Sequence, residues 1–229
     1  MKTIGLIGGT GWVSTLEYYR LINSGINKKL GGHNSARCIL YSVNYDDINK
    51  LNLLEDHEGV YNIVLSAAKI LKTAGVDFLV LCANTLHQYV ERLDRETELP
   101  IVHIADATAS EIKSKSVSTI GLLGTKFTME MDFYSARLEK AGIKTLVPGK
   151  DDRLYIHNAI MNELLKEEFR TETKKKFLQI IGDLQQQGAA GIVLGCTEIP
   201  LLIKQADLML PVFNTLQLHA DAVVDFAVK

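Results

Sequence analysis

The feature that most constrains the fold is a repeat inside the chain. Thr3-Ile-Gly-Leu-Ile-Gly-Gly9 recurs as Thr119-Ile-Gly-Leu-Leu-Gly-Thr125, 116 positions later. Asp132-Phe-Tyr134 likewise resembles Glu17-Tyr-Tyr19, at an offset of 115 positions. Matches that keep their order at a nearly constant offset indicate an internal duplication. The chain therefore has to fold as two similar halves.

A third match extends the repeat to a strand end. Gly75-Val-Asp-Phe-Leu-Val-Leu-Cys-Ala-Asn-Thr85 aligns without a gap with Gly188-Ala-Ala-Gly-Ile-Val-Leu-Gly-Cys-Thr-Glu198. In this alignment Cys196 faces Ala83, and Cys82 lies one residue too early. The two halves thus carry equivalent strand ends, one with a thiol and the other with a methyl group.

Each half reads as alternating strands and helices, which predicts an α/β fold with a parallel sheet in each of two lobes. We expect the lobes to be related by pseudo-twofold symmetry, with an active site between them. Residues 1–104 with 215–229 are predicted to form the N-terminal lobe, and residues 105–214 the C-terminal lobe. The helix from Thr215 onward is expected to return to the first half.

Apolar runs and helical spacing predict the individual elements. The expected strands are Thr3–Ile7 and its repeat within Thr119–Thr125, Arg37–Val43, Asp77–Ala83, Pro100–Ile104, Thr145–Val147, Ile192–Leu194 and Leu210–Phe213. The expected helices begin near Ser14 or Thr15, at Glu58, at a cap formed by Asn84 or Thr85, and at a cap formed by Asp106. Asn44–Asp47 is expected to be a loop.

Composition excludes several classes of function. The 229 residues carry a net charge of −2, which gives no electrostatic footprint for nucleic acid or an anionic membrane. No apolar run approaches the ~20 residues of a membrane span. Three cysteines without a short pairing pattern, and a first strand that leaves no room for a signal peptide, favour a cytoplasmic protein. Metal-binding spacings are missing, so we expect no metal.

Cys196 stands where chemistry is expected. The buried strand Ile192–Leu194 stops just before it, and Pro200 suits the first turn of a helix capped by Thr197 or Glu198. Ligands bind at such carboxyl ends of parallel strands. Free amides and the helix dipole there can lower the pKa of a thiol. A reactive, exposed thiol and a small buried hydrophobe both fit this stretch.

The glycine loop Gly8-Gly-Thr-Gly11 resembles a dinucleotide fingerprint but lacks its G-x-G-x-x-G spacing. We interpret it as a loop for a small anion. Two strand-end sites that face each other across a cleft would suit 1,1-proton transfer, in which one base removes a Cα proton and a second group returns one to the opposite face.

The chain resembles a known family over essentially its whole length. The matching segments are Gly8–Thr15, Tyr18-Tyr19, Arg20–Asn23, Asn84-Thr85, His103–Thr108, Leu122–Thr125, Phe127–Glu130 and Gly195–Glu198. They resemble the cofactor-independent Asp/Glu/hydantoin racemase superfamily, in particular its aspartate/glutamate and broad-specificity amino-acid racemases. The resemblance implies two Rossmann-like domains, an active site between them, no pyridoxal phosphate, no metal and a homodimer.

The chain departs from this family at one catalytic position. By resemblance Cys196 is a catalytic acid/base, but the family's other catalytic cysteine directly precedes Asn-Thr, where this chain has Ala83. Some relatives have threonine there, whereas alanine has no exchangeable proton. Cys82 should point to the opposite face of the strand, into the helix layer. We expect Cys38 to fill the core in mid-strand.

The resemblance also assigns substrate-binding residues. Asn84, Thr85, Thr125 and Thr197 should hold the substrate's carboxylate or amino group, and Thr10 lies in the altered glycine loop. Lys166 is either the lysine that binds a distal carboxylate or a solvated surface lysine. His87 is expected to be structural.

The sequence therefore predicts a cofactor-independent racemase of aspartate, glutamate or a similar small amino acid. Two alternatives remain open. One is a lyase or isomerase of the same superfamily that works with one base. The other is a binding protein that has lost turnover.

Overall fold

The computed structural model describes residues 1–229 and divides into two compact units. Unit 1 comprises Met1–His103 and His219–Lys229, and unit 2 comprises Ile104–Leu218. The chain therefore returns to unit 1 near its C-terminal end. None of the helices is both long enough and apolar enough to cross a bilayer.

Unit 1 is built on a three-stranded parallel sheet in the order β2-β1-β3. Its strands are β1 (Ile4–Gly8), β2 (Cys38–Ser42) and β3 (Phe78–Leu81). β1 and β3 are buried along their whole length, and they read as continuous apolar runs because helices cover both faces.

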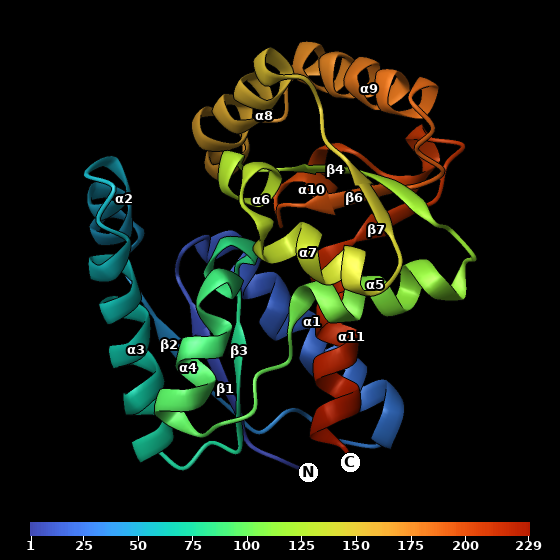
Figure 1. The fold of residues 1–229 in the computed structure, drawn as a ribbon. Coiled ribbons are helices and arrows are strands. Elements are labelled where there is room, and N and C mark those ends of the chain that lie inside the picture. The colour runs from blue at the N-terminus through green and yellow to red at the C-terminus, as the bar shows by residue number, and fades with distance from the viewer. The chain divides into compact units, whose positions relative to one another are not determined.

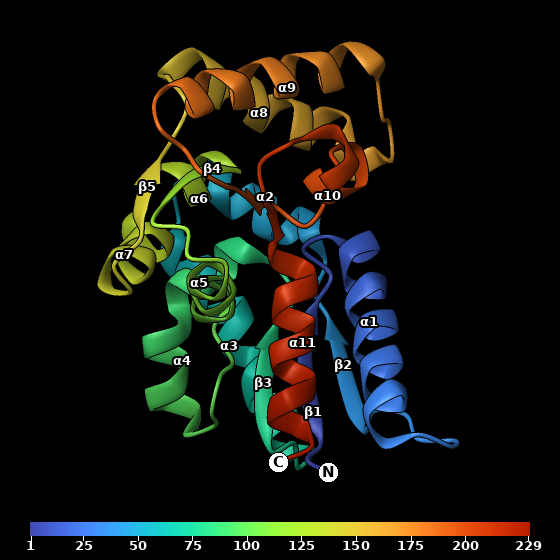
Figure 2. The ribbon, with the colours of Figure 1, turned by 90° about the vertical axis from the view of Figure 1, so that its right-hand side faces the viewer.

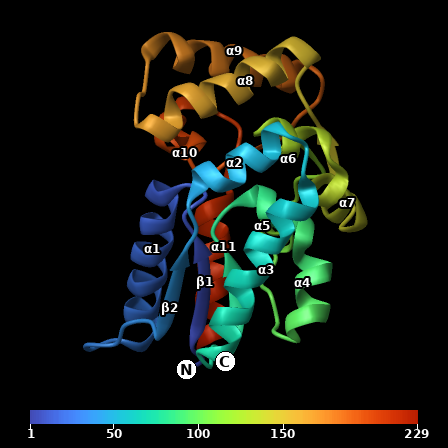
Figure 3. The ribbon, with the colours of Figure 1, turned by 90° about the vertical axis from the view of Figure 1, so that its left-hand side faces the viewer.

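The helices of unit 1 form a layer on each face of this sheet. They are α1 (Trp12–Leu30), α2 (Tyr45–Leu53), α3 (His57–Thr73), the 3₁₀ helix η1 (Asn84–Tyr89), α4 (Val90–Thr97) and the later part of α11 (Thr215–Ala227). α3 and α4 lie against one face, and α1 and α11 lie against the other (Figures 1 and 2). Figure 3 shows the same order from the opposite side, with α3 in front of β1 and α11 behind it.

The C-terminal helix is tied into unit 1 by several contacts. The ring of Phe226 packs edge-on against Phe78, with centroids 4.8 Å apart. A Cβ at Gly25 of α1 would lie 2.8 Å from a methyl group of Val224, so glycine lets α1 and α11 approach closely. The last residues of the chain therefore complete the first unit's helix layer.

Unit 2 is built on a four-stranded parallel sheet in the order β5-β4-β6-β7. Its strands are β4 (Thr119–Gly124), β5 (Lys144–Leu146), β6 (Ile192–Gly195) and β7 (Val212–Asn214). Two parallel sheets, each flanked by helices, confirm the predicted α/β class.

The helices of unit 2 also pack on both faces. They are α5 (Ile104–Ser114), α6 (Lys126–Glu130), α7 (Asp132–Lys140), α8 (Lys150–Asn162), η2 (Leu164–Lys166), α9 (Thr171–Gln186), α10 (Ile199–Leu202) and η3 (Gln205–Asp207). One core cluster joins α8 and α9 to one face, and another joins α5 and α7 to the other (Figure 1).

The registers of the two sheets agree with the sequence repeat. Ile7 of β1 pairs with Leu81 of β3, and Leu123 of β4 pairs with Leu194 of β6. Ile7 and Leu123 are equivalent positions of the repeat, and so are Leu81 and Leu194. The duplication is therefore expressed as the same strand pairing in each unit.

The segment predicted as a loop at Asn44–Asp47 is instead the start of a helix. α2 begins at Tyr45, and the Asn44 side chain accepts a hydrogen bond from the Asp46 amide over 3.4 Å. The prediction was wrong because an asparagine followed by acidic residues is a helix start signal.

The strand predicted at Pro100–Ile104 is reduced to a single bridge between Ile101 and Leu79. Helix α5 already begins at Ile104, so there is no room for a longer strand. Asp106, the expected cap, lies inside the first turn of α5, where its carboxylate pairs with a neighbouring arginine.

Candidate functional site

The end of β6 carries a buried thiol and a buried carboxylate in contact. Cys196 follows β6 directly, and its Sγ donates to Glu198 Oε2 over 2.9 Å. Thr197 Oγ1 donates to the same oxygen, also over 2.9 Å. The side chains of all three residues are buried, with Cys196 only 7% exposed.

This environment raises the pKa of the Cys196 thiol well above its ordinary value, which contradicts the expected decrease. Burial is the largest cause, and the Glu198 carboxylate adds to it by its charge and its hydrogen bond. The backbone amides of Glu198 and Ile199 act in the opposite direction but are outweighed. The thiol is also buried, as in the second of the two interpretations that the sequence left open.

Thr125 lies next to this strand end within unit 2. It follows Gly124, which pairs with Gly195, so the ends of β4 and β6 are neighbours. A Cβ at Gly124 would lie 2.8 Å from the Gly195 carbonyl oxygen, which explains the need for glycine there. Thr125 occupies the N-cap position of α6, and its hydroxyl lies 3.4 Å from that of Thr128.

Lys166 ends η2, and its side chain is exposed. η2 contacts α10, the helix that follows the Cys196 turn. Leu164, at the start of η2, is buried in the same core cluster as Cys196. Lys166 therefore sits on an element beside the strand end, with a side chain that reaches solvent.

In unit 1, the loop after β1 depends on a glycine in a left-handed conformation. Gly9 has a φ of 94°, and a Cβ there would lie 2.1 Å from the carbonyl oxygen of Val43. The Gly9 amide donates to Thr15 Oγ1 over 3.0 Å. Thr10 Oγ1 is buried in this loop without a hydrogen-bond partner, which leaves it available to a bound ligand.

Helix α1 begins earlier than expected. It starts at Trp12 with Gly11 in the N-cap position, not at Ser14 or Thr15. The hydroxyls of Ser14 and Thr15 each donate to the Gly11 carbonyl over 2.8 Å, so they brace the first turn from inside the helix.

The end of β3 carries the turn that the sequence predicts as a substrate-binding segment. Ala83 is half-buried and packs against the core cluster beneath α3 and α4. Asn84 is buried and Thr85 half-buried, and both belong to the 3₁₀ helix η1. The residue in the N-cap position of η1 is Ala83, so neither Asn84 nor Thr85 is the cap that we expected.

The other cysteines lie apart from these turns. Cys82 is fully buried, which raises the pKa of its thiol, and it is not part of the cluster against which Ala83 packs. Cys38 opens β2 rather than lying in mid-strand, and it is half-buried. Burial also raises the pKa of the Cys38 thiol.

Within each unit, the predicted site residues gather at the carboxyl ends of adjacent strands. β1 and β3 are neighbours in unit 1, so the loop with Thr10 and the turn Ala83–Thr85 follow adjacent strands. In unit 2, Thr125 and the turn Cys196–Glu198 do the same. Sequence reasoning considered Glu198 only as a cap, whereas its carboxylate accepts the thiol hydrogen bond.

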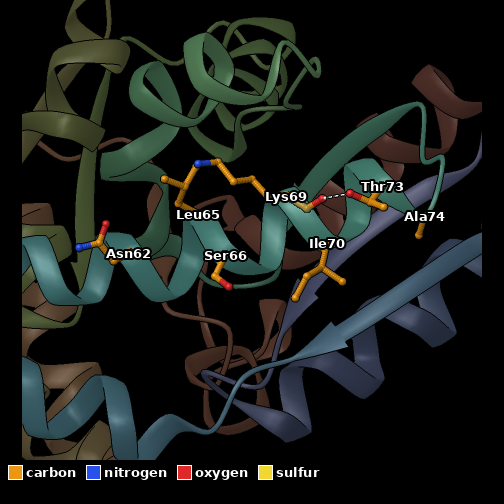
Figure 4. Close-up of a pocket in the computed structure, with 7 residues that line it drawn as sticks. All are labelled: Asn62, Leu65, Ser66, Lys69, Ile70, Thr73 and Ala74. Atoms are coloured by element: carbon orange, nitrogen blue, oxygen red, sulfur yellow. Dashed lines mark hydrogen bonds between the residues drawn. The ribbon is translucent and has the colours of Figure 1, made fainter.

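An open groove of about 570 Å³ lies elsewhere in unit 1, along the outer side of α3 (Figure 4). Its lining residues are Asn62, Leu65, Ser66, Lys69, Ile70, Thr73 and Ala74. The only charged side chain in this lining is Lys69, which pairs with Glu96 at 3.9 Å. The groove offers no acid or base pair comparable to that of Cys196 and Glu198.

Comparisons with known proteins identify one family. The Asp/Glu/Hydantoin racemase family model matches residues 7–223. The broad specificity amino-acid racemase RacX of Bacillus subtilis (strain 168) is 22% identical over 215 residues, which cover 93% of this chain and 92% of that protein.

Two solved structures are similar to this chain over its whole length. A Yersinia pestis protein described provisionally as an Asp/Glu racemase is 42% identical, with a TM-score of 0.93 and 100% of both chains covered. PH1733 of Pyrococcus horikoshii OT3, an aspartate racemase homologue, is 35% identical, with a TM-score of 0.86 and the same full coverage.

Proposed function

The chain belongs to the Asp/Glu/hydantoin racemase family, and on that basis we propose that it racemises aspartate, glutamate or a similar small amino acid without a cofactor. The family relationship supports amino-acid racemisation in general. The observation that carries the proposal for this chain is the buried contact of 2.9 Å between Cys196 Sγ and Glu198 Oε2.

This contact provides a route for proton transfer. Glu198 takes the thiol proton, and the resulting thiolate removes the substrate's Cα proton. The electron pair left on Cα passes into the substrate's carboxylate as an enolate-like charge. Because its pKa is raised, the Cys196 thiolate is a strong base once it has formed. The amides of Glu198 and Ile199 stabilise it meanwhile.

Threonine and amide groups at the strand ends would hold the substrate. We assign Thr10, Asn84, Thr85, Thr125 and Thr197 to its carboxylate and amino groups. The buried, unpartnered hydroxyl of Thr10 supports its part in this assignment, because a buried donor without a partner is costly unless a ligand satisfies it. Lys166 is assigned to the distal carboxylate of an acidic substrate.

The second proton donor is the open part of the proposal. Ala83 stands at the position equivalent to Cys196 and has no proton to exchange. This observation favours a second candidate function, a lyase or isomerase that works with Cys196 as its one base. A binding protein without turnover is the remaining alternative.

We also propose that the protein is a homodimer. α1 exposes three large apolar side chains at helical spacing, Trp12, Leu16 and Tyr19, each more than half exposed. A partner copy would bury them. Light scattering of the purified protein measures its mass directly, and a monomer at all concentrations would contradict the dimer.

Hydrogen–deuterium exchange at Cα distinguishes the candidate functions. Each enantiomer of aspartate, glutamate and a panel of other amino acids is incubated with the protein in D₂O, and deuterium and optical purity are followed. Inversion with exchange implies two proton-transferring groups, and exchange without inversion implies one. If neither occurs with any amino acid of the panel, the racemase proposal fails.

A further inference from the structure

Four buried aromatic side chains of unit 1 form a cluster that proton transfer does not use. They are Tyr18 of α1, His87 of η1, His219 of α11, and His103, which directly precedes α5. The ring centroid of His87 lies 4.7 Å from that of His103 and 5.1 Å from that of His219. None of the four side chains is more than 5% exposed. We call them the histidine cluster.

The hydrogen bonds of His219 fix its protonation pattern. Nε2 lies 2.8 Å from the Val102 carbonyl oxygen, which can only accept, so Nε2 carries a proton. On the neutral ring Nδ1 is then an acceptor, and Tyr18 donates its hydroxyl hydrogen to it over 2.8 Å. Both ring nitrogens are thus committed to protein groups.

The cluster is not arranged as a metal site. No group of three or more histidine, cysteine or acidic side chains in the structure could hold a metal ion. His87 Nε2 is directed to the Leu81 carbonyl oxygen at 3.3 Å, and His219 has no free nitrogen. The rings therefore pack against one another, and His87 and His219 each form a hydrogen bond to a backbone carbonyl group.

The backbone group that His87 binds lies at the start of the turn after β3. Leu81 is the last residue of β3, and His87 lies in η1 on the other side of Ala83–Thr85. The His87 hydrogen bond thus spans the whole turn. Tyr18 belongs to α1, the helix that follows the Thr10 loop, so the cluster also links that helix to the turn.

We propose that the histidine cluster is a positioning element that fixes the turn Ala83–Thr85 in the conformation that binds substrate. The binding part of this inference rests on the proposed function, whereas the fixing of the turn does not. A fully satisfied buried polar network makes its surroundings rigid, and a partly satisfied one does not. Tyr18 and His87 act through the turn and do not touch the reacting atoms.

The test compares Tyr18→Phe with a matched control, Tyr134→Phe. Tyr134 is also fully buried, and its hydroxyl donates to Thr108 Oγ1 over 3.0 Å in unit 2. Each variant loses one buried hydroxyl hydrogen bond, but only Tyr18→Phe disturbs the cluster. Amide hydrogen exchange of peptides that cover residues 83–89 is measured by mass spectrometry on the full-length protein.

We expect Tyr18→Phe to accelerate exchange at 83–89 by about tenfold or more, and Tyr134→Phe to leave it unchanged. His87→Phe keeps a ring but loses the bond to Leu81, and it should also accelerate exchange. His87→Gln can place an amide donor near the Nε2 position, and it should restore slow exchange. Unchanged exchange at 83–89 in both Tyr18→Phe and His87→Phe would overturn the inference.

Kinetics provide the readout that a purely structural role would not change. Loss of positioning raises KM several-fold with little change in kcat, whereas loss of folded protein lowers kcat and leaves KM unchanged. A fall in kcat alone in Tyr18→Phe would contradict the positioning role. If the wild type shows no turnover at all, the proposed function fails, and the exchange measurement still decides whether the cluster fixes the turn. Should Tyr18→Phe not fold, the two His87 variants carry the test.

Discussion

Ala83 and Cys196 occupy the same position on two sheets of the same register. Ala83 lies two residues after Leu81, which pairs with Ile7 in unit 1. Cys196 lies two residues after Leu194, which pairs with Leu123 in unit 2, and these two strand pairs are equivalent in the repeat. One position carries a thiol in contact with a carboxylate, and the other carries a methyl group. The chain has thus kept the duplicated scaffold while its two strand ends differ in chemistry.

Restoring a thiol at the equivalent position should restore a second proton-transferring group. We expect Ala83→Cys to raise the rate of inversion by about 10²–10⁴-fold, the usual contribution of a general acid or base. Ala83 is half-buried, so the added sulfur should cost little stability. The measurement is optical rotation or chiral chromatography of a substrate that shows Cα exchange with the wild type.

Cys82→Ala is the control for this experiment. Cys82 is fully buried and lies outside the cluster that Ala83 contacts, so its loss should leave inversion unchanged. If Cys82→Ala eliminated inversion while Ala83→Cys had no effect, Cys82 would be the second base and the equivalence of Ala83 with Cys196 would have no catalytic meaning.

Glu198 should matter because the proposed mechanism makes it the acceptor of the thiol proton. Glu198→Gln keeps an oxygen that can accept hydrogen bonds from Cys196 and Thr197 but cannot take up a proton. We expect Cα exchange to fall by about 10²-fold or more. Glu163→Gln is a matched control, because Glu163 accepts a hydrogen bond from Thr173 in the same unit. Equal rates in the two variants would remove Glu198 from the mechanism.

The three thiols should differ in reactivity in an order set by burial. We expect iodoacetamide to modify Cys38 first, because it is half-buried, and Cys82 last, because it is fully buried. In the absence of substrate Cys196 should react slowly, since burial and the Glu198 carboxylate raise the pKa of its thiol. Peptide mapping after brief treatment measures the order. Preferential labelling of Cys196 would show that its turn opens in solution.

His219 should make the stability of the fold sensitive to acid. Burial lowers the pKa of His219 from 6.5 to about 4, against the opposing effect of its hydrogen bond to Val102. Because the pKa in the folded state is below that of the unfolded chain, the neutral ring contributes its full stability above about pH 6.5. The free energy of unfolding therefore falls by up to about 3 kcal/mol as the pH falls from about 6.5 toward 4, because protons bind to the unfolded chain first.

Urea unfolding between pH 7 and pH 4.5 tests this linkage. The wild type should lose more unfolding free energy over this range than His219→Gln, which has no group to titrate there. His33→Gln, at an exposed histidine, should follow the wild type. Parallel losses in the wild type and His219→Gln would contradict a lowered pKa at His219.

A parallel sheet in each half was predictable from the sequence, because the repeat preserves both the apolar runs and the glycines at strand ends. Gly8 and Gly124 illustrate this, since a Cβ at Gly8 would lie 2.3 Å from the Thr15 side chain and one at Gly124 would lie 2.8 Å from the Gly195 carbonyl oxygen. The state of the Cys196 thiol was not predictable, because it depends on how the turn folds the Glu198 carboxylate back onto Sγ. α10 is only four residues long, so its dipole cannot offset that burial.

The histidine cluster could not be predicted for a different reason. His87, His103 and His219 are distant in sequence and form no recognisable motif. His87 and His103 meet within the first part of unit 1, and the return of α11 adds His219. The start of α2 was readable in principle, because Asn44 is followed by acidic residues that suit a first helical turn.

The most direct test of the central claim is Cα hydrogen–deuterium exchange in Cys196→Ser, measured on the amino acid that exchanges fastest with the wild type. Serine is nearly the same size as cysteine, so the fold should persist. Its hydroxyl is far less acidic than a thiol, so the base is lost. Cys38→Ser serves as the control. Exchange reduced to the uncatalysed rate in Cys196→Ser, with Cys38→Ser unaffected, is the predicted result. Exchange at the wild-type rate in folded Cys196→Ser would contradict a role for the thiol.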